Sequence, residues 1–274
     1  MRCRRYRPVG ARVRRLLTFT CESAELGASL DPASGSTGLL FVTGGTQTRV
    51  GSHRLFERLA AALSAAGAPC FRFDRRGVGD SGGEDPGWRG SGADLAAAAT
   101  AFRRACPGLQ RIIGIGLCDG ATALALFGAE AGMGGLILIN PWLIEAAPGA
   151  PPAVAIKHHY QERLTSAAGW QKVLSGSVSW TKLLRGIRRI AQGSDPTLAD
   201  EVAAALAAAR IPAEAILAAN DETGIAARHA LSSAAFQGLV RHPPTLIDSP
   251  AHTFSRPQDF ERLLAAVRDV LARI

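Results

Sequence analysis

The sequence lacks the features that mark membrane, nucleotide-binding and disordered proteins. No apolar run approaches the roughly 18 residues of a membrane span, and no G-K-[ST] loop is present to bind a nucleotide phosphate. Aromatic residues make up only 6% and charged residues 20% of the 274 residues, whereas 47% are hydrophobic. A chain of this length and composition can bury a large core, so we expect one α/β domain or a core domain with an insertion.

Cysteine pairs with the spacing of a metal site or a redox site are also missing. The chain has no C-x-x-C pair and no Cys/His spacing of a zinc site, and its five cysteines are Cys3, Cys21, Cys70, Cys106 and Cys118. An odd number of scattered thiols is typical of a reducing compartment. We therefore expect a cytoplasmic protein without a metal or another cofactor.

The positive charge of the chain is confined to its start. The net charge is +8, yet seven of the 31 Lys and Arg residues lie in residues 2–15, and the remaining 24 face 23 acidic residues. The body of the protein is nearly neutral, so no nucleic-acid partner is expected. Residues 1–15 are predicted to be a basic, disordered tail, with a nucleic-acid arm or an export signal as alternatives.

Short apolar runs alternate with helical segments along most of the chain. The predicted strands are 16–21, 26–30, 39–43, 69–73, 112–115, 135–139, 213–219 and 245–248. Strands separated by helices indicate right-handed crossovers and a mostly parallel sheet. From residue 143 to about residue 206, prolines and amphipathic segments replace this alternation of strands and helices. We therefore assign 16–142 and 207–274 to the core and 143–206 to an inserted cap above the carboxyl edge of the sheet.

One stretch has the spacing of a nucleophile elbow. Gly116-Leu117-Cys118-Asp119-Gly120 joins the strand ending at 115 to a helix, in the pattern G-x-nucleophile-x-G with a thiol as the nucleophile. Such a turn strains the backbone of the apex residue and leaves no room for side chains two positions before and after it. Glycine, which has no side chain, fits at both of these positions. The alternative is a buried structural cysteine.

A glycine pair follows the central strand 39–43. Backbone N–H groups at such a position can face a pocket, so Gly45, Thr46 and the N–H of Asp119 are the predicted oxyanion hole; a tight turn at Gly44-Gly45 is the alternative. Residues that could touch a substrate near this loop or from the cap are Arg49, His53, Trp142 and His158. For Arg49 and His53 the alternative is a solvated helix start, and for His158 a surface role.

An acid and a histidine follow two later strands. Asp221 comes just after the strand 213–219, and His252 lies in the loop after the strand 245–248. Active-site residues of open α/β sheets collect at the carboxyl ends of strands. Asp221 could instead cap the following helix, with Glu222 as a second candidate acid, and His252 could be an ordinary loop histidine.

Four motifs together resemble the exosortase A system-associated hydrolase 1 family, within the α/β-hydrolase superfamily. They are FRFDRRGVGDSGG (71–83), GLCDGATALAL (116–126), NPW (140–142) and PPAVAIKHHYQERL (151–164), and the similarity extends from about Val13 through nearly all of the chain. The resemblance implies an α/β-hydrolase fold, a mostly parallel sheet flanked by helices with a helical cap. It also implies a link to bacterial exopolysaccharide and exosortase systems, and an architectural role for the Asp74–Arg76 loop.

Nucleophile, acid and histidine occur in the chain order of the α/β-hydrolase triad, which is Cys118, Asp221 and His252 here. His252 would take the thiol proton and Asp221 would orient the imidazole. A thiolate is expelled from a tetrahedral intermediate more readily than an amine, so the predicted substrate is a small-molecule ester or thioester that forms a thioester acyl-enzyme. Alternatives are an acyltransferase with the same triad, or a non-catalytic binding protein, which the neighbouring Asp119 carboxylate favours.

Overall fold

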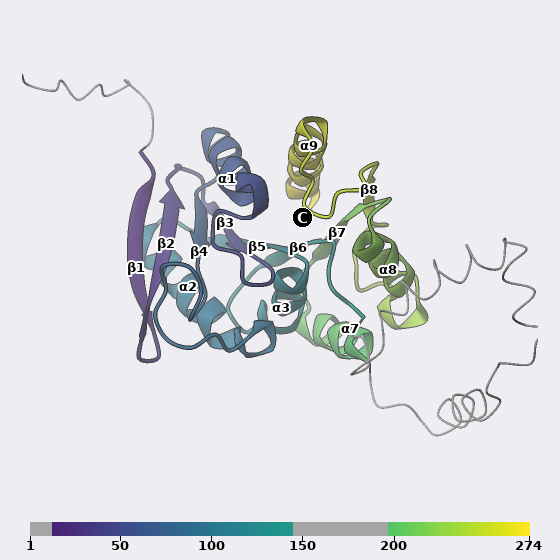
Figure 1. Ribbon diagram of the computed structural model, residues 1–274, viewed down its shortest axis with the longest axis horizontal. Helices are drawn as coiled ribbons and strands as arrows, with labels where there is room; N and C mark the ends of the chain where they lie inside the picture. The colour runs from purple at the N-terminus through teal and green to yellow at the C-terminus, as the bar shows by residue number, and fades with distance from the viewer. Residues whose placement is uncertain (1–12, 145–196) are drawn as a thin grey trace, which may run out of the picture.

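The fold is built on one eight-stranded sheet (Figure 1). The computed structural model describes residues 13–144 and 197–274. The strand order is β1-β2-β4-β3-β5-β6-β7-β8. The strands are β1 (Arg15–Cys21), β2 (Ala24–Asp31), β3 (Thr37–Val42), β4 (Cys70–Phe73), β5 (Arg111–Leu117), β6 (Gly135–Ile139), β7 (Ala213–Ala218) and β8 (Thr245–Ile247). Only β1–β2 and β2–β4 pair antiparallel, so the predicted mostly parallel sheet is confirmed.

Helices cover both faces of the sheet. They include α1 (Leu55–Ala65), α2 (Gly92–Ala105), α3 (Asp119–Phe127), α7 (Leu198–Ala209), α8 (Glu222–Leu231) and α9 (Pro257–Arg273). In Figure 1, α1 and α9 lie on one side of the strands, and α2, α3 and α7 lie on the other. Along β3, Leu39 and Phe41 pack in the core with α1 and α9, whereas Leu40 and Val42 pack with α2 and α3. Both faces of the central strands are buried, which explains their continuous apolar sequences.

The parallel strands bring distant loops to one edge of the sheet. Cys118 follows β5, Asn140 follows β6, Asp221 follows β7, and the loop with His252 follows β8. These four strands are neighbours in the sheet and run in the same direction. Residues separated by more than 130 positions in the sequence therefore meet at the carboxyl edge, the edge where ligands bind in open α/β sheets.

Helix α7 begins within the range 143–206 expected for the insertion, yet it packs on the core. Its buried residues Leu198, Val202 and Leu206 belong to the same apolar cluster as α2 and α3. Thr197 caps its start in a capping box with Asp200. Residues 198–206 therefore contribute to the core, because an amphipathic helix with this many buried apolar residues needs the sheet layer beneath it. Residues 145–196 of the expected cap lie outside the described residues.

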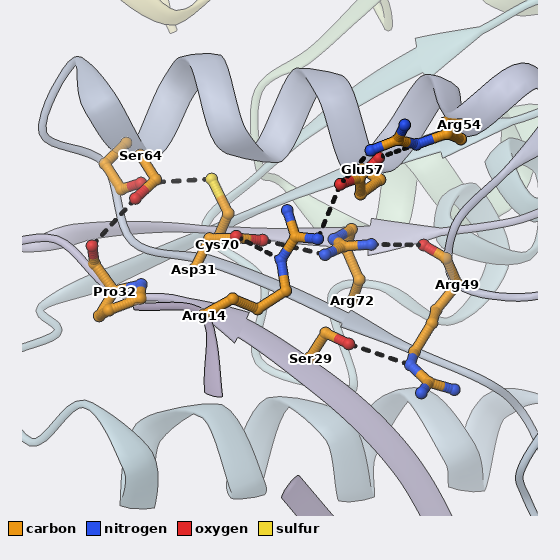
Figure 2. A network of polar contacts seen from close by, with 11 residues as sticks. Arg14, Ser29, Asp31, Pro32, Arg49, Arg54, Glu57, Ser64, Cys70 and Arg72 are labelled. Atoms are coloured by element: carbon orange, nitrogen blue, oxygen red, sulfur yellow. Dashed lines mark hydrogen bonds and ion pairs between the residues drawn. The ribbon is translucent and has the colours of Figure 1, made fainter. Parts of the chain in front are cut away.

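A buried arginine network ties the start of the chain to the sheet (Figure 2). Arg72 of β4 is 1% exposed and donates to Asp31 at 3.0 Å. Arg14 donates to Asp31 at 2.6 Å and to Glu57 of α1 at 2.8 Å. Arg14 falls inside the predicted disordered tail, so the boundary at residue 15 was wrong: two carboxylates fix this part, and β1 begins at Arg15. Residues 1–12 of the predicted tail lie outside the described residues.

Candidate active site

Cys118 occupies a strained turn between β5 and α3. Its φ of 59° and ψ of −129° lie in a region that side-chain-bearing residues rarely adopt. The flanking glycines are required by close packing: a Cβ on Gly116 would lie 2.7 Å from the backbone of Ala121, and one on Gly120 would lie 2.6 Å from the carbonyl oxygens of Val42 and Thr43. The turn predicted from the G-x-C-x-G spacing therefore has the geometry of an elbow, with the partly exposed thiol at its apex.

His252 and Asp221 form a hydrogen-bonded pair at the same edge. The Nδ1 atom of His252 lies 2.9 Å from Oδ2 of Asp221. The same carboxylate oxygen accepts a hydrogen bond from the N–H of Gly224 at 3.0 Å and so caps α8. One carboxylate therefore both caps the helix and holds the imidazole, and the catalytic role of Asp221 stays a prediction. Glu222, the second candidate acid, lies exposed in the first turn of α8.

The electrostatics of His252 link it to both Cys118 and Asp221. Burial by itself lowers the pKa of His252, but hydrogen bonds to Asp221 and to Cys118, with the charge of each, raise the pKa to about 10. The imidazolium form is therefore favoured at neutral pH when the sulfur facing it is a thiolate. The Cys118 sulfur is therefore one of the groups that raise the pKa of His252, and Asp221 holds Nδ1 of the same imidazole.

Asn140, directly after β6, is a supporting residue that the sequence analysis did not single out. It is fully buried at a φ of 42°. Its Oδ1 accepts from the N–H of Ala218 at 2.8 Å, and its Nδ2 donates to the carbonyl oxygen of His252 at 2.9 Å. One amide therefore joins the end of β7 to the loop with His252. The only sequence signal was its place in the NPW motif after a buried strand.

The glycine loop after β3 packs against the elbow, but one of its N–H groups is engaged. A Cβ on Gly44 would lie 3.0 Å from Cβ of Cys118, so the loop touches the apex residue. The N–H of Gly45, predicted to be an oxyanion donor, instead donates to Oδ1 of Asp119 at 2.7 Å. The N–H groups of Thr46 and Asp119 have no hydrogen-bond partner among the described residues. The Gly45 N–H is therefore engaged in the protein without a substrate, and its role as an oxyanion donor stays a prediction.

Comparisons with known proteins give the fold and no closer relationship. No protein-family model matches the chain, and no curated protein is similar to it. An esterase from Pyrococcus furiosus superposes with a TM-score of 0.66 at 17% identity, covering 95% of this chain and 91% of that chain. An α/β-hydrolase from a Penicillium species superposes with a TM-score of 0.62 at 18% identity, covering 95% of this chain and 98% of that chain. A dienelactone hydrolase from Anabaena variabilis superposes with a TM-score of 0.59 at 14% identity, covering 94% of this chain and 95% of that chain.

The chain has the α/β-hydrolase fold. The elbow, the acid and the histidine lie at the carboxyl edge of this fold, after β5, β7 and β8. The fold predicted from the sequence resemblance is thereby confirmed. Membership of the exosortase A system-associated hydrolase 1 family stays a prediction. Structural neighbours that are only 13–18% identical in sequence to this chain show its fold but not its family.

Two of the residues predicted to contact substrate, Arg49 and Trp142, lie in different surroundings. Arg49 forms structural pairs with Asp74, with Asp80 at 2.7 Å and with Ser29 at 3.0 Å, and its predicted contact with substrate stays a prediction. Trp142 lies beside the elbow, where its backbone N–H donates to the carbonyl oxygen of Cys118 at 3.2 Å.

The remaining candidate contacts are two histidines. His53 is exposed in the turn before α1, with a φ of 52° and no hydrogen bond to another described residue. The position of His158 lies outside the described residues, so its predicted contact stays a prediction.

Residues 13–144 and 197–274 hold neither a cluster of metal-ligating side chains nor a membrane-spanning helix. They contain no group of three or more His, Cys, Asp or Glu side chains that could hold a metal ion. No helix in these two ranges is both long and apolar enough to cross a membrane.

Proposed function

We propose that the protein is a cysteine-dependent hydrolase of esters or thioesters, with Cys118 as nucleophile, His252 as base and acid, and Asp221 as the residue that orients the imidazole. The observation that carries the proposal is the pairing of a strained elbow thiol with a histidine that Asp221 holds at 2.9 Å. A nucleophile within reach of a base, and a base oriented by a third group, is the arrangement that covalent acyl transfer needs.

The reaction follows from these positions. His252 accepts the Cys118 proton, and the thiolate sulfur attacks the acyl carbon to form a tetrahedral intermediate whose oxygen is negatively charged. The N–H of Asp119, at the start of α3, has no other partner among the described residues and supports that oxygen together with the helix dipole. The C–O or C–S bond to the leaving group then breaks, and the imidazolium gives its proton to the departing alcohol or thiol. Water, deprotonated by His252, hydrolyses the thioester.

The leaving group sets the substrate class. A thiolate departs from a tetrahedral intermediate more easily than an amine does, so the forward reaction favours esters, thioesters and lactones over amides. The structural neighbours that are named an esterase and a dienelactone hydrolase support this choice. The resemblance of residues 71–83 and 116–126 supports a role in a bacterial exopolysaccharide or exosortase system.

Mass spectrometry of the acyl-enzyme tests the proposal. The protein is incubated with a panel of p-nitrophenyl esters and acyl thioesters, quenched in acid and digested, and the peptide that contains Cys118 is weighed. We expect the acyl mass on that peptide and loss of turnover in Cys118→Ala. Cys106→Ala is the matched control, since this thiol is free and partly exposed but follows α2, away from the elbow. Equal turnover in Cys118→Ala and wild type would contradict the proposal.

A non-catalytic ligand-binding protein is the second candidate, and one observation favours it. The Asp119 carboxylate holds the N–H of Gly45, so a negative charge sits where an oxyanion would form. A binding protein would show saturable ligand binding without any acyl adduct on Cys118. The same mass measurement therefore separates the two functions.

A further inference from the structure

Asp119 places a carboxylate beside the reacting sulfur. It is the residue after Cys118 and the first residue of α3, and its Oδ1 accepts the Gly45 N–H at 2.7 Å. The loop is shaped to receive this carboxylate, because a Cβ on Gly44 would lie only 2.6 Å from Oδ1 of Asp119. Any larger residue at position 44 would push the carboxylate away from Gly45. The contact between Asp119 and Gly45 therefore depends on the residue types in both the glycine loop and the start of α3.

The Gly45 residue is held from two sides. Its N–H is bound by Asp119, and its carbonyl oxygen accepts from a guanidinium nitrogen of Arg75 at 2.6 Å. Arg75 is itself paired with Asp85 at 2.9 Å. With both polar groups of Gly45 engaged, the loop cannot turn its N–H toward a substrate oxygen unless the Asp119 carboxylate moves.

The Asp119 charge has no counterion in the described part of the chain. Arg75, whose guanidinium contacts Gly45, is paired with Asp85, while Arg49 is paired with Asp74 and Asp80, and His252 with Asp221. No ion pair to Asp119 is formed by residues 13–144 or 197–274. An anionic group entering beside Cys118 would therefore meet a carboxylate that no ion pair of the described residues neutralises, whereas a cationic group or a hydrogen-bond donor would find an acceptor.

We propose that Asp119 is the specificity-determining gate of the oxyanion site: its carboxylate holds the Gly45 N–H in the free protein and selects neutral or cationic acyl groups over anionic ones. This inference rests on the proposed function for its meaning in catalysis. A donor group on the correct substrate draws the carboxylate off Gly45 and frees the N–H for the oxyanion. An anionic acyl group cannot do so.

Two substitutions separate the charge from the contact. Asp119→Asn removes the charge but keeps an oxygen that can accept from Gly45, whereas Asp119→Ala removes both. Glu84→Gln is the matched control, since Glu84 is an exposed carboxylate in the loop after β4 that makes no contact with the elbow. If the gate acts as proposed, the charge effect appears in both Asp119 variants and the loss of the Gly45 contact only in the alanine variant.

Alkylation of Cys118 measures the charge effect without a substrate. Rates are compared for neutral iodoacetamide, anionic iodoacetate and cationic 2-bromoethylamine, each normalised to the urea-unfolded protein; in each case a sulfur–carbon bond forms and halide leaves. We expect the iodoacetate-to-iodoacetamide ratio to rise about tenfold in both Asp119 variants, the effect of one unit charge about 10 Å away at an effective dielectric constant near 20. The bromoethylamine-to-iodoacetamide ratio falls. A ratio that stays within twofold of wild type in both variants overturns the charge selection.

Amide hydrogen exchange of Gly45, followed by NMR, measures the contact. The Gly45 N–H is expected to be protected in wild type and in Asp119→Asn, and to exchange at least tenfold faster in Asp119→Ala. Equal exchange in wild type and Asp119→Ala refutes the gate. Neither measurement depends on turnover, so a failed gate is distinguishable from a failed function: only equal ester turnover in Cys118→Ala and wild type contradicts the latter.

Discussion

Replacing Asn140 by leucine tests whether one buried amide holds the histidine loop in place. The side chain is of similar size but cannot accept from Ala218 or donate to the carbonyl oxygen of His252. The N–H of Ala218 would lose its partner in a fully buried environment, and the carbonyl oxygen of His252 would lose its partner in a partly buried one. The backbone φ of 42° adds to the cost, since asparagine tolerates this region better than leucine does.

The magnitude follows from these contacts. Each buried polar group left unpaired costs about 1–3 kcal/mol, and a leucine in the left-handed region costs about 1–2 kcal/mol. The free energy of unfolding should therefore fall by about 3–8 kcal/mol. Because a domain is typically stable by only about 5–15 kcal/mol, such a loss is easily measured. Asn140→Asp, which keeps the acceptor for Ala218 but turns a carboxylate toward the His252 carbonyl oxygen, should lose part of this amount.

Urea unfolding followed by circular dichroism measures the effect. Asn220→Leu is the matched control: Asn220 also lies at the carboxyl edge, but it is exposed, and its side chain donates only to Asp248 at 2.8 Å. A change within about 0.5 kcal/mol is expected there. If Asn140→Leu loses less than about 1 kcal/mol, the two hydrogen bonds do not hold the loop and the reasoning is wrong.

Further predictions concern pH, the elbow glycines and the buried network. Because the pKa of His252 is raised to about 10 and its protonated form serves the leaving group, kcat/KM for an ester should fall as pH rises through that value. Asp221→Asn should move this fall to lower pH; an unmoved pH profile would contradict the pairing. Gly120→Ala should unfold at lower urea concentration than Gly108→Ala, since only the first Cβ would meet backbone atoms, at 2.6 Å. Arg72→Met should cost about 1–3 kcal/mol in the same assay, because it removes the hydrogen bond at 3.0 Å to Asp31 and leaves Arg14 as the remaining partner of that buried carboxylate; unchanged or increased stability would refute this.

The strands of the fold were predictable because both of their faces are buried. Each apolar run lies in a strand of the sheet, and the alternation of strands and helices implied parallel pairing. The predicted ends of the N-terminal tail and of the cap differ from the structure, because contacts between distant residues fix where these segments end. Arg14 looked like part of a charged tail, yet Asp31 and Glu57 bind it. Helix α7 looked like part of the cap, yet its apolar face packs on the core.

The site was predictable where local geometry fixes it. The glycines around Cys118 follow from the steric demands of the turn, and the positions of Asp221 and His252 follow from the ends of their strands. Arg49 could not be assigned in the same way. Its guanidinium pairs with Asp74 and Asp80, which lie in a later loop, so no pattern near Arg49 in the sequence indicates these contacts.

The sequence by itself determined the fold class and the elbow, because both depend on periodicity and spacing within a few residues. Only the tertiary structure decided which polar groups pair across the chain. The N–H of Gly45 meets the Asp119 carboxylate 74 residues away, and Asn140 meets the His252 loop 112 residues away. Such contacts depend on the packing of whole elements and on side-chain directions, which no local pattern encodes. These two contacts hold the Gly45 loop and the His252 loop beside the elbow, whose position the sequence predicts.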